Sequence, residues 1–169
     1  RMLVAWAQAE GITHVASADD HELTDPEISE TPDFTSTYPP HCLRGTRGAT
    51  KIAETAQAEP VPLGLTDVPE RWFRGREFLL LKKHFDVFTN PNAERLLALL
   101  DPEEVVVFGV ATDVCDDAAI RGLLERGRNV TFVTDASRGL DEARTAACTA
   151  SWRAAGVRSL AETPASGAA

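Results

Sequence analysis

The chain has 169 residues, 43% of them hydrophobic and 25% charged, which fits one soluble globular domain with a sizeable core. A net charge of −9, with no run of lysine or arginine, argues against nucleic acid or an anionic membrane surface as a partner, since both would repel the chain. No apolar run approaches the roughly 20 residues that a bilayer requires, and no cationic stretch precedes an apolar one at the N-terminus, so neither a membrane span nor a signal peptide is expected.

Three cysteines stand far apart in the sequence, at Cys42, Cys115 and Cys148. An odd number at such spacings matches neither a disulfide framework nor a zinc site of paired cysteines. We therefore expect free thiols and a protein of the reducing cytoplasm. Cys42 and Cys148 are expected to pack in the interior rather than to ligate a metal.

Apolar patterning and chain breakers predict helices that alternate with strands. In chain order we expect a helix over residues 2–10, strands over 12–18 and 77–83, a helix over 91–100, a strand over 104–110, a helix over 113–126, a strand over 129–134, a helix over 141–154 and a last strand over 157–161. A long polar connection over residues 22–38 follows the first strand. Loops of this length inside a compact domain often carry function.

This alternation predicts the α/β fold class, as a three-layer α/β/α arrangement around a mainly parallel sheet. The run over residues 104–110 is apolar without interruption, as expected of a parallel strand that is buried on both faces. We expect one domain over residues 1–162, followed by a disordered tail over residues 163–169.

Chemically capable residues follow several of the predicted strands. Asp19 and His21 follow the first strand, Lys82 lies at the end of the second, and Cys115 follows the apolar strand. In open α/β sheets, ligands bind at the carboxyl ends of the strands. We therefore expect these four residues to converge on one edge of the sheet.

Cys115 stands between a buried strand and a helix, where the helix dipole and unpaired N–H groups favour a thiolate and would hold an oxyanion. By position alone it is either a nucleophile or a buried, inert cysteine. Lys82 would lower the pKa of a neighbouring thiol, or else point to solvent past the strand end. Lys83 alternates to the opposite face, so the two lysines are not expected to serve the same site.

Asp19 and His21 share a face at the strand end, and His41 comes from the loop beyond. One carboxylate and two imidazoles suit Zn²⁺, Fe²⁺ or Mn²⁺, with coordination positions left open for water or substrate. The alternative is the ordinary polarity of a surface loop. His14 and His84 are not part of this group of candidate metal ligands and are expected to be structural.

Residues 109–115 (GVATDVC), followed by a helix, Gly127 and the segment 134–136, resemble the signature of the isochorismatase-like cysteine hydrolases. In that family the cysteine is the nucleophile, so the resemblance gives this role to Cys115. It also implies a cis peptide bond before Ala111 and an oxyanion hole formed by the N–H groups of Ala111 and Cys115. Asp113 and Asp135 lie close in the sequence, but the motif gives neither of them a catalytic role.

Lys82, followed by Phe85 and Phe88, is similar to the K-x-x-F/Y-x-x-F element that supplies the catalytic lysine of this family. The family also has a first strand that carries its catalytic aspartate, and no such segment precedes Met2. We therefore expect either that the natural protein holds further N-terminal residues or that this chain lacks its general base.

Residues 19–21 (DDH) and 38–49 (YPPHCLRGTRGA) are close to the D-W-H and W-P-x-H-C-x-x-G-T-x-G-A elements of nicotinamidases. The metal of those enzymes orients the pyridine nitrogen of the substrate. The resemblance therefore implies that Asp19, His21 and His41 are metal ligands. Zinc is the expected ion, with iron or manganese as alternatives.

The sequence departs from the nicotinamidase pattern in two places. Asp20 stands where the tryptophan of D-W-H is expected, and no further histidine follows within residues 22–28. We expect the acidic loop over residues 22–37 to shape a different pocket. The substrate is therefore expected to be an amide or related acyl compound, and nicotinamide itself is left open.

The resemblance implies an isochorismatase-like, Rossmann-like α/β fold. It also implies an enzyme that hydrolyses the C–N bond of a small-molecule amide through a thioester on Cys115. Family members are commonly homo-oligomers, dimers or tetramers. Two alternatives stay open: a metal-independent hydrolase of an isochorismate-like ether or a carbamoyl compound, and a catalytically inactive relative that serves as a binding partner.

Overall fold

The structure is a computed structural model that describes residues 2–161. The chain divides into two compact units, Arg1–Leu96 and Leu97–Ala169. The predicted α/β class with parallel strands is confirmed in each unit. The tail predicted over residues 163–169 lies outside the described residues. Within residues 2–161, no helix is long and apolar enough to span a bilayer.

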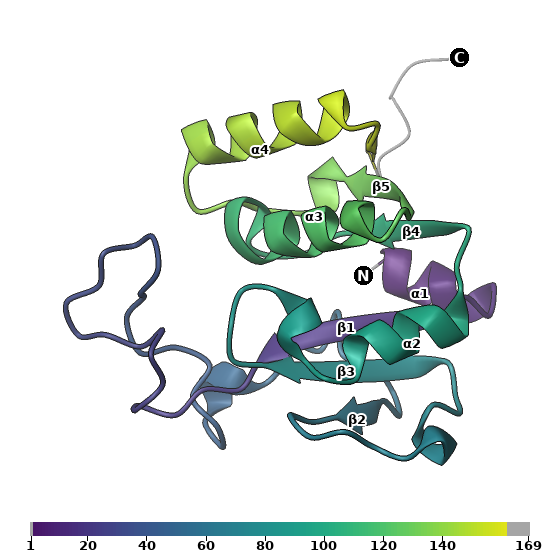
Figure 1. The fold of residues 1–169 in the computed structure, drawn as a ribbon, viewed down its shortest axis with the longest axis horizontal. Helices are drawn as coiled ribbons and strands as arrows, with labels where there is room; N and C mark the ends of the chain where they lie inside the picture. The colour runs from purple at the N-terminus through teal and green to yellow at the C-terminus, as the bar shows by residue number, and fades with distance from the viewer. Residues whose placement is uncertain (1, 162–169) are drawn as a thin grey trace. The chain divides into compact units, whose positions relative to one another are not determined.

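The first unit is built on a parallel sheet with the order β1-β3-β2. Its strands are β1 (His14–Asp19), β2 (Val61–Leu63) and β3 (Glu77–Lys82), with β3 in the middle (Figure 1). Helix α1 (Met2–Ala9) precedes β1, and α2 (Ala93–Leu100) follows β3 and crosses the boundary between the units. The buried hydrophobic residues of this unit are Val4, Ala16, Leu63, Phe78, Leu80, Ala93 and Leu96.

The alternation of β3 places a lysine at the end of a buried row. Phe78, Leu80 and Lys82 are buried, while the residues between them are only half-buried, as the period of two in a strand requires. In the register of the sheet, Lys82 lies opposite Asp19, the last residue of β1. The two strands therefore end together and present an ammonium and a carboxylate at the same edge.

The connection predicted over residues 22–38 is a folded loop rather than a helix or strand, and it extends away from β1 in Figure 1. A bridge between Ile28 and Tyr38 closes it, and Asp33 organises its tip by accepting the N–H groups of Thr35, Ser36 and Thr37 at 2.8–2.9 Å. These backbone donors hold the pKa of the Asp33 carboxyl well below its usual range. The bridge and these hydrogen bonds turn the loop back on itself between residues 28 and 38.

The second unit holds a parallel sheet with the order β4-β5-β6. Its elements are β4 (Glu104–Val107), α3 (Asp117–Glu125), β5 (Asn129–Val133), α4 (Glu142–Ala154) and β6 (Arg158–Leu160). Phe132 of β5 packs edge-to-face against Trp152 of α4, with ring centroids 5.0 Å apart. The indole Nε1 of Trp152 donates to Asp117 at 2.8 Å, which joins the beginning of α3 to α4.

Two predictions about the elements are corrected, and one strand was not predicted. Strand β4 ends at Val107 and is not buried on both faces: Val106 is 40% exposed, and Val105 and Val107 are only half-buried. The helix predicted over 113–126 begins instead with a π-helical turn, Thr112–Asp116, and continues as α3. Strand β2 was not predicted, since Val61–Leu63 is short and contains a proline, which an edge strand tolerates.

Candidate metal centre and nucleophile turn

The first unit brings together the three predicted metal ligands, Asp19, His21 and His41, which we call the ligand cluster. One ligand atom from each residue lies within 4.8 Å of the others. A parallel bridge produces this closeness: the N–H of His21 donates to the carbonyl of Cys42 at 3.2 Å, and the N–H of Arg44 donates to the carbonyl of His21 at 2.9 Å. The bridge carries His41 to His21, with ring centroids 4.8 Å apart.

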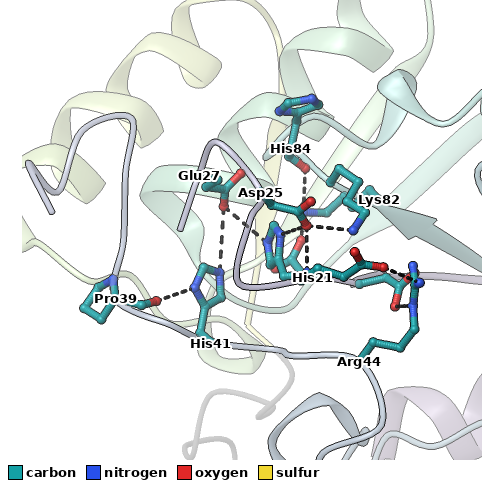
Figure 2. Close-up of polar contacts among 12 residues, drawn as sticks. His21, Asp25, Glu27, Pro39, His41, Arg44, Lys82 and His84 are labelled. Atoms are coloured by element: carbon teal, nitrogen blue, oxygen red, sulfur yellow. Dashed lines mark hydrogen bonds and ion pairs between the residues drawn. The ribbon is translucent and has the colours of Figure 1, made fainter. Parts of the chain in front are cut away.

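Both imidazoles are oriented through their Nδ1 atoms, as Figure 2 shows. Nδ1 of His41 is 2.8 Å from the carbonyl oxygen of Pro39, and Nδ1 of His21 is 3.3 Å from Oδ2 of Asp25. Acceptors at Nδ1 assign the proton to that atom and leave the lone pair of Nε2 for a metal. Nε2 of His21 is buried and has no hydrogen-bond partner among the described residues. An orphaned buried nitrogen of this kind fits a metal ligand.

Burial also sets the charge of the His21 ring, which has no exposed surface. Loss of hydration lowers the pKa of His21, against the opposing effect of its hydrogen bond to Asp25. The ring is therefore neutral at neutral pH, and the neutral imidazole is the form that ligates a metal.

Glu27 is a fourth member of the site that the sequence did not predict. Its side chain is 6% exposed, and its Oε1 lies 3.6 Å from Nε2 of His21 and 3.8 Å from Nε2 of His41 (Figure 2). Burial raises the pKa of the Glu27 carboxyl, and the nearby carboxylate of Asp19 raises it further. A cation among these groups would relieve both effects. Within a loop rich in acids, nothing in the sequence distinguishes this glutamate from its exposed neighbours.

Lys82 borders the ligand cluster rather than pointing to solvent. It is 2% exposed, its Nζ contacts the Asp19 carboxylate, and it also donates to the carbonyl of His84 at 2.9 Å. The predicted juxtaposition of Lys82 and Asp19 at one strand edge is therefore confirmed within this unit. Its convergence with Cys115 stays a prediction, because the two residues belong to different units.

The prediction that Lys82 and Lys83 lie at different sites is wrong, because the Lys83 side chain also reaches the surroundings of the ligand cluster. Strand β3 ends at Lys82, and Lys83 lies in the bend that follows, where strand alternation no longer applies. Its Nζ lies 2.6 Å from Oδ2 of Asp25, the carboxylate that faces His21. The ammonium of Lys83 is the largest cause that lowers the pKa of Asp25 to about 2.

Asp20, the residue at the place of the nicotinamidase tryptophan, is engaged with the same returning segment. It accepts from Nε of Arg44 at 2.8 Å, and Arg44 also reaches Glu22 at 2.7 Å. The hydrogen bond from Arg44 lowers the pKa of the Asp20 carboxyl. Asp20 therefore joins the end of β1 to Arg44 in the segment that follows His41.

The second unit holds Cys115 in the π-helical turn Thr112–Asp116, immediately before α3. The N–H of Asp116 donates to the carbonyl of Ala111 at 3.1 Å, which gives the wide turn, and the peptide bond between Val110 and Ala111 is cis, as the resemblance implies. Single π-helical turns are frequent at functional sites. The Cys115 side chain is half-buried.

Asp113, which lies within this turn, makes structural contacts. The Asp113 side chain has no exposed surface, accepts the N–H groups of Leu140 and Asp141 at 2.7 and 3.0 Å, and pairs with Arg144 at 3.2 Å. These contacts join the turn to the beginning of α4.

The other two cysteines lie in surroundings that disfavour a thiolate. Burial is the largest cause that raises the pKa of Cys42 and of Cys148. Both side chains are half-buried.

The fold and these groups describe a parallel α/β protein with a carboxylate–imidazole cluster and a cysteine in a strand-to-helix turn. The family model for the Isochorismatase domain matches residues 1–164. The chain therefore belongs to the isochorismatase family and has the fold of its hydrolases. No curated protein matches the sequence significantly.

Solved structures agree with this assignment. The pyrazinamidase of Pyrococcus horikoshii, solved in complex with zinc, superposes with a TM-score of 0.70 at 19% identity over 95% of this chain and 81% of its own. The nicotinamidase of Bacillus subtilis gives 0.72 at 17% identity over 95% and 81% of the two chains. The N-carbamoylsarcosine amidase of Thermoplasma acidophilum gives 0.70 at 19% over 98% and 81%. At these identities, the likeness establishes the fold.

Proposed function

We propose that the protein is a metal-dependent cysteine hydrolase that cleaves the C–N bond of small-molecule amides in the manner of a nicotinamidase. The observation that carries the proposal is the ligand cluster, in which Asp19, His21 and His41 present ligand atoms within 4.8 Å of one another. Nε2 of His21 is buried and makes no hydrogen bond within residues 2–161, which supports a metal at this place over ordinary loop polarity.

The ligand cluster would hold the metal through the Asp19 carboxylate and the Nε2 atoms of His21 and His41, with Glu27 close enough to join them. This donor set of carboxylates and imidazoles suits zinc, and it also suits iron or manganese. When bound, the metal supplies a Lewis acid that orients a ring nitrogen of the substrate or a water molecule.

The covalent chemistry would be carried by Cys115. Its thiolate attacks the carbonyl carbon of the amide, and the backbone N–H groups of Ala111 and Cys115 stabilise the oxyanion that forms. The C–N bond then breaks as the leaving nitrogen takes up the proton that the thiol lost on forming the thiolate, and it departs as ammonia or an amine. Water hydrolyses the thioester to the acid and restores the thiol. Lys82 assists by favouring the thiolate and the developing negative charge.

Tyr38 favours a substrate with a planar ring. Its ring lies edge-to-face with His41 of the ligand cluster at 6.3 Å and with Phe85 at 5.5 Å, so an aromatic wall borders the metal position. Its hydroxyl donates to the carbonyl of Phe34 at 3.2 Å, which fixes the ring. Aromatic rings pack favourably in such offset and edge-on arrangements, so a heteroaromatic amide suits this wall.

A carbamoyl hydrolase that needs no metal is the second candidate. The structural likeness to an N-carbamoylsarcosine amidase favours it, as does Asp20 at the position of the nicotinamidase tryptophan. Such an enzyme would use the same nucleophile on a flexible, ringless substrate.

Ammonia release from pyridine and pyrazine carboxamides and from N-carbamoyl amino acids separates the two candidates. Each assay is run on protein stripped with chelator and on protein reloaded with zinc, iron or manganese, with His41→Ala in parallel. We expect release from the ring amides that is lost on stripping, restored by metal and absent in His41→Ala. Hydrolysis of carbamoyl compounds that is indifferent to chelator and to His41→Ala would support the second candidate instead.

A further inference from the structure

We propose that Asp25 and Lys83 are positioning residues for the metal centre, acting together on the imidazole of His21. The inference rests on the proposed function, since it assigns a purpose to residues behind a ligand of that centre. It concerns the chain of contacts from the ammonium of Lys83 through the carboxylate of Asp25 to Nδ1 of His21.

Oδ2 of Asp25 makes all the contacts that link Lys83 to His21. It accepts the backbone N–H of Glu22 at 2.8 Å and the ammonium of Lys83 at 2.6 Å, and it faces Nδ1 of His21 at 3.3 Å. Two donors from different parts of the polypeptide therefore fix the Asp25 carboxylate in the position where it faces the imidazole of His21. Residues Glu22 and Asp25 belong to the loop after β1, whereas Lys83 follows β3, so the contact also joins the loop to the sheet.

The burial of His21 gives this arrangement its effect. The ring has no exposed surface, so water cannot reorient it, and its Nε2 has no hydrogen-bond partner among the described residues. A carboxylate at Nδ1 fixes the tautomer that leaves Nε2 unprotonated and makes that nitrogen a better electron donor to a metal. The side chains of Asp25 and Lys83 are only 15% and 22% exposed, so solvent screens their attraction only in part.

Two consecutive lysines thus support two different members of the ligand cluster. Lys82, the last residue of β3, contacts Asp19 directly, and Lys83, the first residue of the bend, reaches His21 through Asp25. The end of β3 at Lys82 is what allows both, because continued strand alternation would send Lys83 away from the loop.

The test is zinc affinity, measured by competition with a chromophoric chelator on the purified full chain. We expect Asp25→Asn to weaken zinc binding by about 10- to 100-fold and Lys83→Met by about 10-fold, the range for partners behind a ligating histidine. Lys83→Arg, which keeps the charge, should bind near the wild-type level. Lys51→Met removes a lysine that is not among the described contacts of the cluster and should leave the affinity unchanged.

The double variant Asp25→Asn/Lys83→Met gives the sharper readout. Because Lys83 acts through Asp25, the double variant should bind zinc no more weakly than Asp25→Asn alone. The visible spectrum of the cobalt-substituted protein should shift in Asp25→Asn and in Lys83→Met and stay unchanged in Lys51→Met. Thermal unfolding of the metal-free variants reports the fold, and Lys83→Met carries the test if Asp25→Asn does not fold.

Wild-type affinity in the folded Lys83→Met variant, or losses that simply add in the double variant, would overturn this proposal while leaving the metal centre in place. A wild-type chain that binds no zinc, iron or manganese would overturn the metal centre and the positioning role together. Amide hydrolysis dependent on Cys115 would then still support the covalent half of the proposed function.

Discussion

The two histidines of the ligand cluster are held by different acceptors. His21 faces the Asp25 carboxylate, which is itself held by an ammonium, whereas His41 faces the backbone carbonyl of Pro39. A carboxylate acceptor strengthens an imidazole as an electron donor more than a neutral carbonyl does. We therefore expect His21 to be the more firmly bound ligand of the two.

Glu27 gives a test of the cluster at the scale of one residue. We expect Glu27→Gln, which keeps the shape and removes the charge, to lower zinc affinity by about 10-fold, because Oε1 lies close to both Nε2 atoms. Chelator competition measures the change. Glu30→Gln alters an exposed acid of the same loop and should have no effect. Equal affinities in wild type and Glu27→Gln would exclude Glu27 from the site.

The sequence allowed part of this site to be predicted. Asp19 and His21 are two residues apart at a strand end, and their motif, together with that of His41, indicated a shared ligand set that the structure brings together. Glu27 and Asp25 were not predictable, since their placement depends on the path of a loop closed by the bridges Ile28–Tyr38 and His21–Leu43. No local pattern of residues encodes those long-range pairings.

At the scale of the elements, long periodic segments were predictable and short or irregular ones were not. Strand β3 shows clear alternation and was found within one residue of its observed end. Strand β2 has three residues and no such signal, and the π-helical turn before α3 has the same composition as an ordinary first helical turn. Strand β4 leaves Val106 40% exposed, which its uninterrupted apolar sequence does not reveal.

Glu77, the first residue of β3, makes the stability of the first unit depend on pH. Its carboxylate accepts the N–H groups of Ala58 and Glu59, each at 3.0 Å. These hydrogen bonds lower the pKa of Glu77 from the ordinary value of 4.5, and the bond from Glu59 has the largest effect. A lowered pKa in the folded state adds stability that is complete above pH 4.5 and is lost as the pH falls through the folded-state pKa.

We therefore expect Glu77→Gln to lower the free energy of unfolding by about 1 kcal/mol at pH 7. The difference from wild type should shrink steadily as the pH falls below 4.5. Urea unfolding at a series of pH values measures it, with the exposed Glu10→Gln as the matched control. A difference that stays constant, or grows, as the solution is acidified would contradict this assignment.

At the scale of the whole molecule, family membership and chemistry rest on different grounds. The Isochorismatase domain match over residues 1–164 and the structural likenesses establish the family and its fold. The chemistry depends on two groups of residues: the ligand cluster with Lys82 in the unit Arg1–Leu96, and the turn with Cys115 in the unit Leu97–Ala169. Their joint action in one reaction is the central claim of the proposed function.

The most direct test of that claim compares ammonia release by the wild type, Cys115→Ala and Cys148→Ala, with zinc content and unfolding temperature measured on the same samples. We predict that Cys115→Ala lowers kcat by at least about 10³-fold, because no thioester can form, while zinc content and unfolding temperature stay at the wild-type values. Cys148→Ala, which alters a half-buried thiol of α4, should retain most of the activity. A Cys115→Ala protein that releases ammonia at the wild-type rate would contradict the account.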